Sequence, residues 1–85
     1  MPRISSFYGI VITMYLSEHP PPHFHARYAE HTAQVLFDGS ILRGSLPTRA
    51  RALVVERAHL HGDELVANWE RAKERQQLVK IDPLP

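Results

Sequence analysis

The first half of the chain alternates between apolar and polar positions in short runs, a pattern that favours β-strands. Residues 7–15 are rich in β-branched and aromatic side chains on both faces, as expected of a central strand. Three later runs, residues 23–28, 32–38 and 41–45, follow a period of two, and Asp38-Gly39 is a strong turn signal between the last two. We therefore predict an antiparallel meander of about four strands.

After Pro47 the apolar period changes to that of an α-helix. On a helical wheel of residues 48–75, one stripe collects Ala50, Val54, Ala58, His61, Leu65, Trp69 and Ala72. The stripe keeps its phase through Gly62, which favours one long helix, with a kink at Gly62 as the alternative. An unbroken helix would be ~42 Å long, whereas a nine-residue strand reaches only ~30 Å. The half that carries Trp69 therefore needs either a bend or a second copy of the chain to pack against.

These elements predict an α+β fold in which the meander packs on one C-terminal helix, all within a single domain over residues 1–85. A chain of 85 residues supports one small core. The apolar run over residues 7–16 is too short to span a bilayer and lacks a small-residue cleavage site. We expect no signal peptide in it, no membrane partner and a cytoplasmic location.

Composition narrows the chemistry that is available. The chain has no cysteine, which excludes disulfides, thiolate nucleophiles and cysteine-type zinc sites. The formal net charge is +1 with the six histidines counted as neutral. Protonated histidines would make the surface clearly basic below about pH 6.

Candidate chemistry concentrates in the stretch HPPPHFH, residues 19–25, which holds half of the histidines. In the strand that follows the prolines, Phe24 and Tyr28 are expected to face the helix. Alternate residues point to the other side of a strand. The opposite face then carries three candidate site residues, which are His23, His25 and Arg27.

One interpretation of this face is a metal site. Two histidines at positions i and i+2 have Cα atoms roughly 6.6 Å apart, which lets both imidazoles bind one ion. His19, carried there by the stiff proline loop, is the predicted third ligand, and water would complete a tetrahedral zinc site. Glu18 is the carboxylate placed to orient these ligands.

Two other interpretations remain open. The face is either the solvated side of the sheet, with imidazole N–H groups bonded to loop carbonyls and no cofactor expected, or a site for phosphate or RNA. In the second case Tyr8 or Tyr15 offers a stacking ring. Metal-free RNA cleavage needs a base, an acid and a cation, which two histidines and an arginine can supply.

His61 lies in the middle of the apolar stripe and is either a core histidine with one satisfied hydrogen bond or a further catalytic residue. With His23 and His25 on the far face of the sheet, His61 would meet them only through a partner subunit or the opposite strand orientation. Glu64, three residues further along the helix, either orients His61 or faces solvent.

Several segments together resemble a known family. MPRIS, FYGIVITMY, HPPPHFHARY, GSLPTR, HGDELVANWERA and KIDPL are similar to segments of a small bacterial domain of unknown function, DUF4160, over nearly the whole chain. The family's two histidine patterns fall on His19, Pro21, Pro22, His23, Phe24 and His25, and on His61, Glu64, Leu65, Asn68 and Trp69. This chain departs from the family at Arg57, where the resemblance leads us to expect a tryptophan.

The resemblance implies no agreed activity. Its members are commonly encoded beside another small protein, in an arrangement like that of a toxin and its antitoxin, which implies a cytoplasmic bacterial protein with a cognate partner. Glu64, Asn68 and Trp69 are then partner or packing residues. Our leading hypothesis is one half of such a module, docking through a helix face or an open strand edge and with a homodimer as one possible assembly. The alternatives are a metal-independent ribonuclease-like toxin that uses His23, His25 and Arg27, with His61, and a regulator that binds a divalent metal such as zinc.

Overall fold

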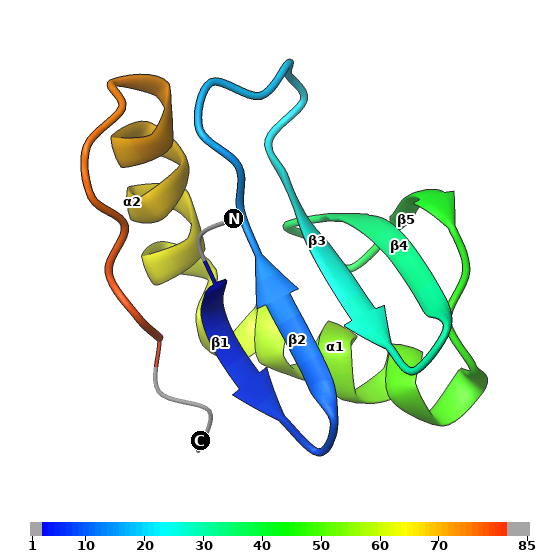
Figure 1. Cartoon of the computed structure of the whole chain (residues 1–85). Helices are drawn as coiled ribbons and strands as arrows, with labels where there is room; N and C mark the ends of the chain where they lie inside the picture. The colour runs from blue at the N-terminus through cyan, green and yellow to red at the C-terminus, as the bar shows by residue number, and fades with distance from the viewer. Residues whose placement is uncertain (1–2, 82–85) are drawn as a thin grey trace.

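The structure is a computed structural model and describes residues 3–81. It is an α+β fold in which five antiparallel strands form a meander, in the order β1-β2-β3-β4-β5, followed by two helices (Figure 1). The elements are β1 (Arg3–Phe7), β2 (Ile10–Thr13), β3 (His23–Tyr28), β4 (His31–Leu36), β5 (Ile41–Gly44), α1 (Thr48–Leu60) and α2 (Gly62–Lys73). The predicted fold class and the antiparallel meander are confirmed.

The prediction of a single strand over residues 7–15 is wrong. The structure has a hairpin there, β1 and β2, joined by Tyr8 and Gly9 at φ 50° and 80°. Two successive residues with positive φ make the tight turn that suits the twist of paired strands, and glycine adopts this conformation without steric cost. The apolar residues on both sides of Tyr8 hide this turn in the sequence.

The single helix over residues 48–75 is also wrong. The chain forms α1 of 13 residues and α2 of 12 residues, with the break at His61, where φ is −116° and ψ is 27°. Hydrogen bonds of helical spacing continue on both sides, from the His61 N–H to the Arg57 carbonyl and from the Leu65 N–H to the His61 carbonyl. The break is therefore a sharp bend without a loop. It brings α2 back over the sheet and removes the overhang of a straight helix.

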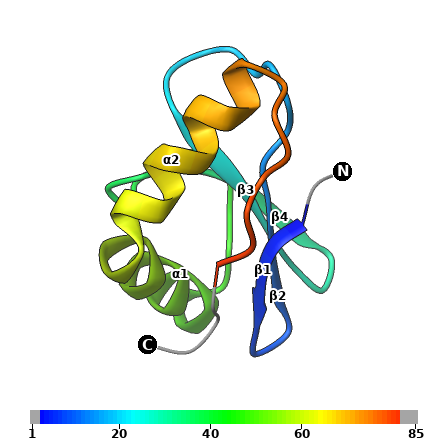
Figure 2. The same ribbon diagram turned by 90° about the vertical axis from the view of Figure 1, so that its left-hand side faces the viewer.

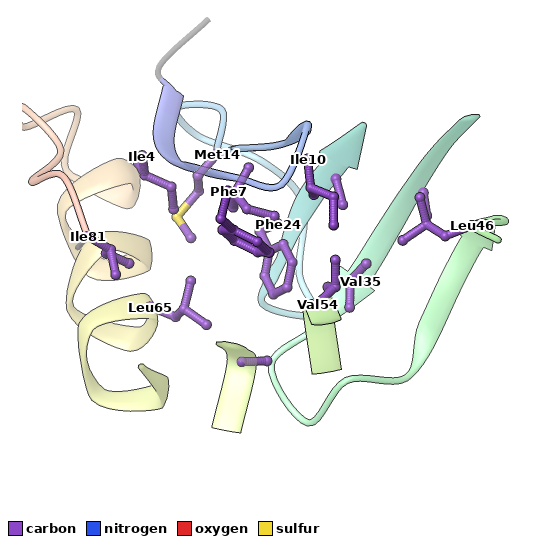
Figure 3. Packing of buried hydrophobic residues seen from close by; sticks show 14 of the residues in the cluster. Ile4, Phe7, Ile10, Met14, Phe24, Val35, Leu46, Val54, Leu65 and Ile81 are labelled. Atoms are coloured by element: carbon purple, nitrogen blue, oxygen red, sulfur yellow. The ribbon is translucent and has the colours of Figure 1, made fainter. Parts of the chain in front are cut away.

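Both helices lie on the same side of the sheet, as Figure 2 shows with the sheet nearly edge-on. The apolar face of the sheet and the inner faces of the helices form one core between them. Residues in this core include Ile4, Phe7, Ile10, Met14, Phe24, Val35, Leu46, Val54, Leu65 and Ile81 (Figure 3). Neither helix in the described part of the chain is long and apolar enough to cross a membrane.

Asn68 fastens the C-terminal segment to α2. Its side chain is 1% exposed, donates to the Val79 carbonyl at 2.8 Å and accepts from the Val79 N–H at 2.8 Å. Two residues further on, the Ile81 N–H donates to the Ile4 carbonyl of β1 at 2.7 Å. Asn68 therefore has a packing role in this structure, and so does Trp69, which is 4% exposed.

Candidate functional site

Three side chains that can bind a metal ion meet near the start of β3. His23 and His25 come from β3, and Glu18 comes from the loop that connects β2 to β3. One ligand atom from each lies within 4.8 Å of the others. The Oε1 atom of Glu18 is 2.5 Å from His25 Nε2 and 3.5 Å from His23 Nε2, so one carboxylate oxygen reaches both imidazoles.

The loop before β3 sets the position of Glu18. Its Ser17 N–H donates to the carbonyl of Ala72 at 3.1 Å, which ties the loop to the end of α2. The prolines after Glu18 have no N–H groups to donate. The Pro21 carbonyl accepts a hydrogen bond from His23, whose Nδ1 is 2.8 Å away.

The environment of His23 fixes how its ring can act. A carbonyl oxygen only accepts hydrogen bonds, so the contact with Pro21 places a proton on Nδ1, and in the neutral ring this leaves the lone pair on Nε2. His23 is 4% exposed, and its Nε2 is buried with no hydrogen-bond partner among the described residues. Histidines that bind metal ions through Nε2 commonly donate Nδ1–H to a backbone carbonyl in this way.

The structure separates His23 from the exposed face on which we expected it. The ring of His23 lies 5.5 Å from that of Trp69 on α2, measured between centroids, because the loop and the end of α2 close over the start of β3. His25 and Arg27 do lie together on the open face, where both line one cleft. The predicted grouping therefore holds for His25 with Arg27, and for His25 with His23, whose ring centroids are 5.3 Å apart. The solvent exposure expected for His23 is wrong.

His19, the predicted third metal ligand, is exposed and lies outside the cluster of Glu18, His23 and His25. Glu18 takes the place that we assigned to His19. The acidic residue directly before HPPPHFH was a visible signal. Its role as a ligand depends on the path of the loop, which residue spacing does not reveal.

The open-face cleft has a volume of about 290 Å³. The imidazole of His25 meets the ring of Tyr15 edge to face at its side, with centroids 4.5 Å apart. Two guanidinium groups, of Arg3 and Arg27, also line it. The metal-ligand cluster and the cleft therefore share one residue, His25.

His61 lies apart from this cluster. Its Nδ1 is 2.6 Å from Glu64 Oε1, so Glu64 orients the ring, which is one of the two roles considered for it, although its own side chain is exposed. The ring lines a small cavity of about 20 Å³ together with Arg57 and Leu65. Arg57, at the position where the resemblance implies a tryptophan, is 9% exposed and lies over the Phe7 ring at 4.9 Å, so it packs through a cation–π contact.

Chemically, the cluster offers two imidazole nitrogens and one carboxylate oxygen. This donor set occurs in catalytic zinc sites and in non-haem iron sites, where further positions stay open to water or substrate. Glu18, His23 and His25 are therefore the residues of this chain that could hold a divalent ion.

The comparisons with known proteins identify the family. No curated protein and no solved structure matches the chain. The family described as "Domain of unknown function (DUF4160)" matches residues 9–70, a segment that includes Glu18, His23, His25 and both helices up to Glu70. Because this match covers well over half of the sequence, the chain belongs to the DUF4160 family.

Proposed function

We propose that the protein binds a divalent transition-metal ion, zinc in the first instance, through Glu18, His23 and His25. The observation that carries the proposal is the buried Nε2 of His23, which has no hydrogen-bond partner among the described residues and lies 3.5 Å from Glu18 Oε1. A buried polar atom without a partner costs free energy, and a metal ion at this position would satisfy it.

The distances suit a small ion. Ligand bonds of about 2.0 to 2.1 Å in a tetrahedral site place neighbouring ligand atoms roughly 3.4 Å apart. The contact of 3.5 Å between His23 and Glu18 already matches this spacing. The contact of 2.5 Å between His25 and Glu18 is a hydrogen bond that would widen by about 1 Å as the ion displaces the shared proton. Both side chains are partly exposed, which leaves room for that movement.

Metal binding would also connect the loop to the core. Glu18 sits one residue after Ser17, which bonds to the end of α2, and His23 packs on Trp69 of the same helix. An ion bound by Glu18 and His23 would therefore lock the β2–β3 loop onto α2. This supports a regulatory function in which metal occupancy sets the order of the loop.

Isothermal titration calorimetry of chelator-treated protein with zinc tests the proposal. We expect one saturable zinc site in the wild type. Its affinity for zinc should fall more than about tenfold in Glu18→Gln and in His25→Ala. His19→Ala is the matched control because His19 is exposed and outside the cluster, and it should bind zinc as the wild type does. Absence of saturable binding, or equal losses in His19→Ala and His25→Ala, would defeat the proposal.

A second candidate function is the two-protein regulatory module, of the toxin and antitoxin kind, in the cytoplasm of a bacterium. It is supported by Tyr8, which is 71% exposed, and by the groove of about 480 Å³ that Tyr8 lines with Tyr28 and Leu53. Exposed aromatic rings beside a groove are frequent anchors at protein interfaces.

Co-expression with the product of the neighbouring gene tests this second function. Co-purification of the two proteins with wild-type Tyr8, and its loss in Tyr8→Ser, would support docking at the groove. Absence of a complex with the wild type would count against the module. We do not propose the metal-independent ribonuclease, because His23 is buried against Trp69 and does not line the cleft that Arg27 lines.

A further inference from the structure

We propose that the open face of the sheet binds the phosphate groups of single-stranded RNA. This face is the side of the meander that carries no helix, and Figure 1 looks onto it with α1 behind the sheet. The proposal rests on the register and the charge of the strands. It does not depend on a bound metal ion.

The strand register places two arginines at the ends of one row. Consecutive pairings run from Arg3 to Thr13, from Thr13 to His25, from His25 to Gln34 and from Gln34 to Arg43. Directly paired residues point to the same side of a sheet, so this row crosses all five strands on the open face. Strands lie about 4.8 Å apart, which separates Arg3 and Arg43 by roughly 19 Å.

Arg27 adds a third cation beside the centre of this row. It is two residues from His25 on β3 and therefore points to the same face, with its Cα roughly 6.6 Å away. All three arginines of this face, Arg3, Arg27 and Arg43, are exposed. The face thus carries three positive charges that span the width of the sheet.

No carboxylate neutralises these charges within the sheet. The sequences of the five strands contain neither aspartate nor glutamate. Among residues 3–81, the ion pairs involve histidines and one lysine and none of the three arginines. Guanidinium groups without a carboxylate partner bind phosphate oxygens strongly, often through two parallel hydrogen bonds.

The cleft on this face supplies the other contacts that RNA requires. Arg3 and Arg27 line it together with the rings of Tyr15 and His25 and the side chains of two threonines. Arginines beside aromatic rings suit a single strand, because the guanidinium groups follow the phosphates while the rings stack on bases. Sheet faces with exposed rings recognise single-stranded RNA in this manner in unrelated folds.

The shape of the face favours a single strand over a duplex. The major groove of double-stranded RNA is too deep and narrow for side chains on a sheet to read, and its known binding domains span about 16 base pairs across two minor grooves. A face roughly 19 Å wide covers only a few nucleotides.

Fluorescence anisotropy with a short labelled oligouridylate, in buffer that contains a metal chelator, tests the proposal. Three phosphate contacts predict a slope of about −2 for log K against log salt concentration. Arg27→Gln/Arg43→Gln should reduce the magnitude of this slope, from about 2 to about 0.7, and raise the Kd roughly tenfold at low salt. Arg49→Gln/Arg51→Gln is the matched control, since it removes the same charge from exposed positions on α1 and should bind nearly as the wild type.

Equal losses of affinity in the two double variants would overturn the proposal, because binding would then follow net charge alone. So would a duplex of the same length that binds as tightly as the single strand. Amide chemical shifts provide a second readout that needs no variant. We expect changes on addition of the oligonucleotide at Thr13, His25 and Gln34, and changes confined to α1 and α2 would contradict the assignment of the face.

Discussion

The ring of His23 lies 5.5 Å from the indole ring of Trp69, so the candidate metal centre is in direct contact with the core of the protein. His23 thereby joins two parts of the molecule: its Nε2 faces Glu18, and its ring packs on α2. Within residues 3–81, the other buried side-chain nitrogens without a hydrogen-bond partner belong to Arg57 and His61. Replacing His23 therefore changes packing and metal binding together.

Replacing His23 by alanine should destabilise the fold by about 2 to 3 kcal/mol, because a buried ring is removed from its contact with Trp69. His19→Ala should change the free energy of unfolding by less than about 0.5 kcal/mol, since His19 is exposed. Urea denaturation followed by tryptophan fluorescence measures both. Equal effects of the two substitutions would show that His23 does not pack as described.

Gly44 and Gly62 should respond oppositely to alanine. A Cβ atom on Gly44 would lie 2.2 Å from the Thr32 carbonyl oxygen, and the residue has φ 80°, so Gly44→Ala should cost more than about 2 kcal/mol. A Cβ on Gly62 would meet no atom within 4 Å, and Gly62→Ala should stabilise the protein by about 0.4 to 1 kcal/mol. Thermal unfolding compares the two variants. A Gly62→Ala protein less stable than the wild type would indicate that the bend at His61 needs glycine.

Asn68→Ala should release the C-terminal segment. The substitution leaves the N–H and the carbonyl of Val79 without their partner and should cost about 2 kcal/mol. Amide hydrogen exchange would show the release directly, as faster exchange at Val79 and Ile81. The amides of β3 and β4 serve as internal controls. Unchanged protection at Val79 would be inconsistent with a fastening role for Asn68.

Asp38 should give the fold an acid-sensitive turn. The backbone N–H of Ser40 donates to the Asp38 carboxylate at 2.8 Å and holds the pKa of this carboxyl below its usual value. A pKa lowered by folding means a contribution to stability that is present above the unfolded pKa and is lost as the pH falls through the folded one. The stability difference between the wild type and Asp38→Ala should therefore shrink from about pH 5 to about pH 2. A difference between the urea midpoints of the two proteins that stays constant over this pH range would argue against the effect.

The periodicity of β3 predicts part of the open face correctly. A period of two in β3 places His25 and Arg27 on one side and Phe24 on the other, and the structure agrees. The same period puts His23 on the open side of the strand, yet the loop and α2 bury it. Burial by a neighbouring segment is a tertiary effect, and alternation along one strand carries no information about it.

The errors in the elements have local causes. Tyr8 at positive φ is unusual for an aromatic residue, so the turn that divides the first apolar run showed only through Gly9. The bend at His61 leaves the apolar stripe in phase on both sides, which periodicity alone cannot distinguish from a continuous helix. The sequence puts Glu18 close to the histidines along the chain. Its position as a ligand, however, is set by the backbone hydrogen bond from the Ser17 N–H to the Ala72 carbonyl.

Long-range ¹H–¹⁵N NMR spectra of the imidazoles, recorded before and after zinc is added, test the metal site formed by Glu18, His23 and His25 most directly. We expect His23 to start with its proton on Nδ1, and zinc to shift the Nε2 resonances of His23 and His25. The signals of His19 and His61 should stay unchanged. A shift at His19 or His61, or the absence of any shift at His23 Nε2 at saturating zinc, would show that zinc does not bind at Glu18, His23 and His25.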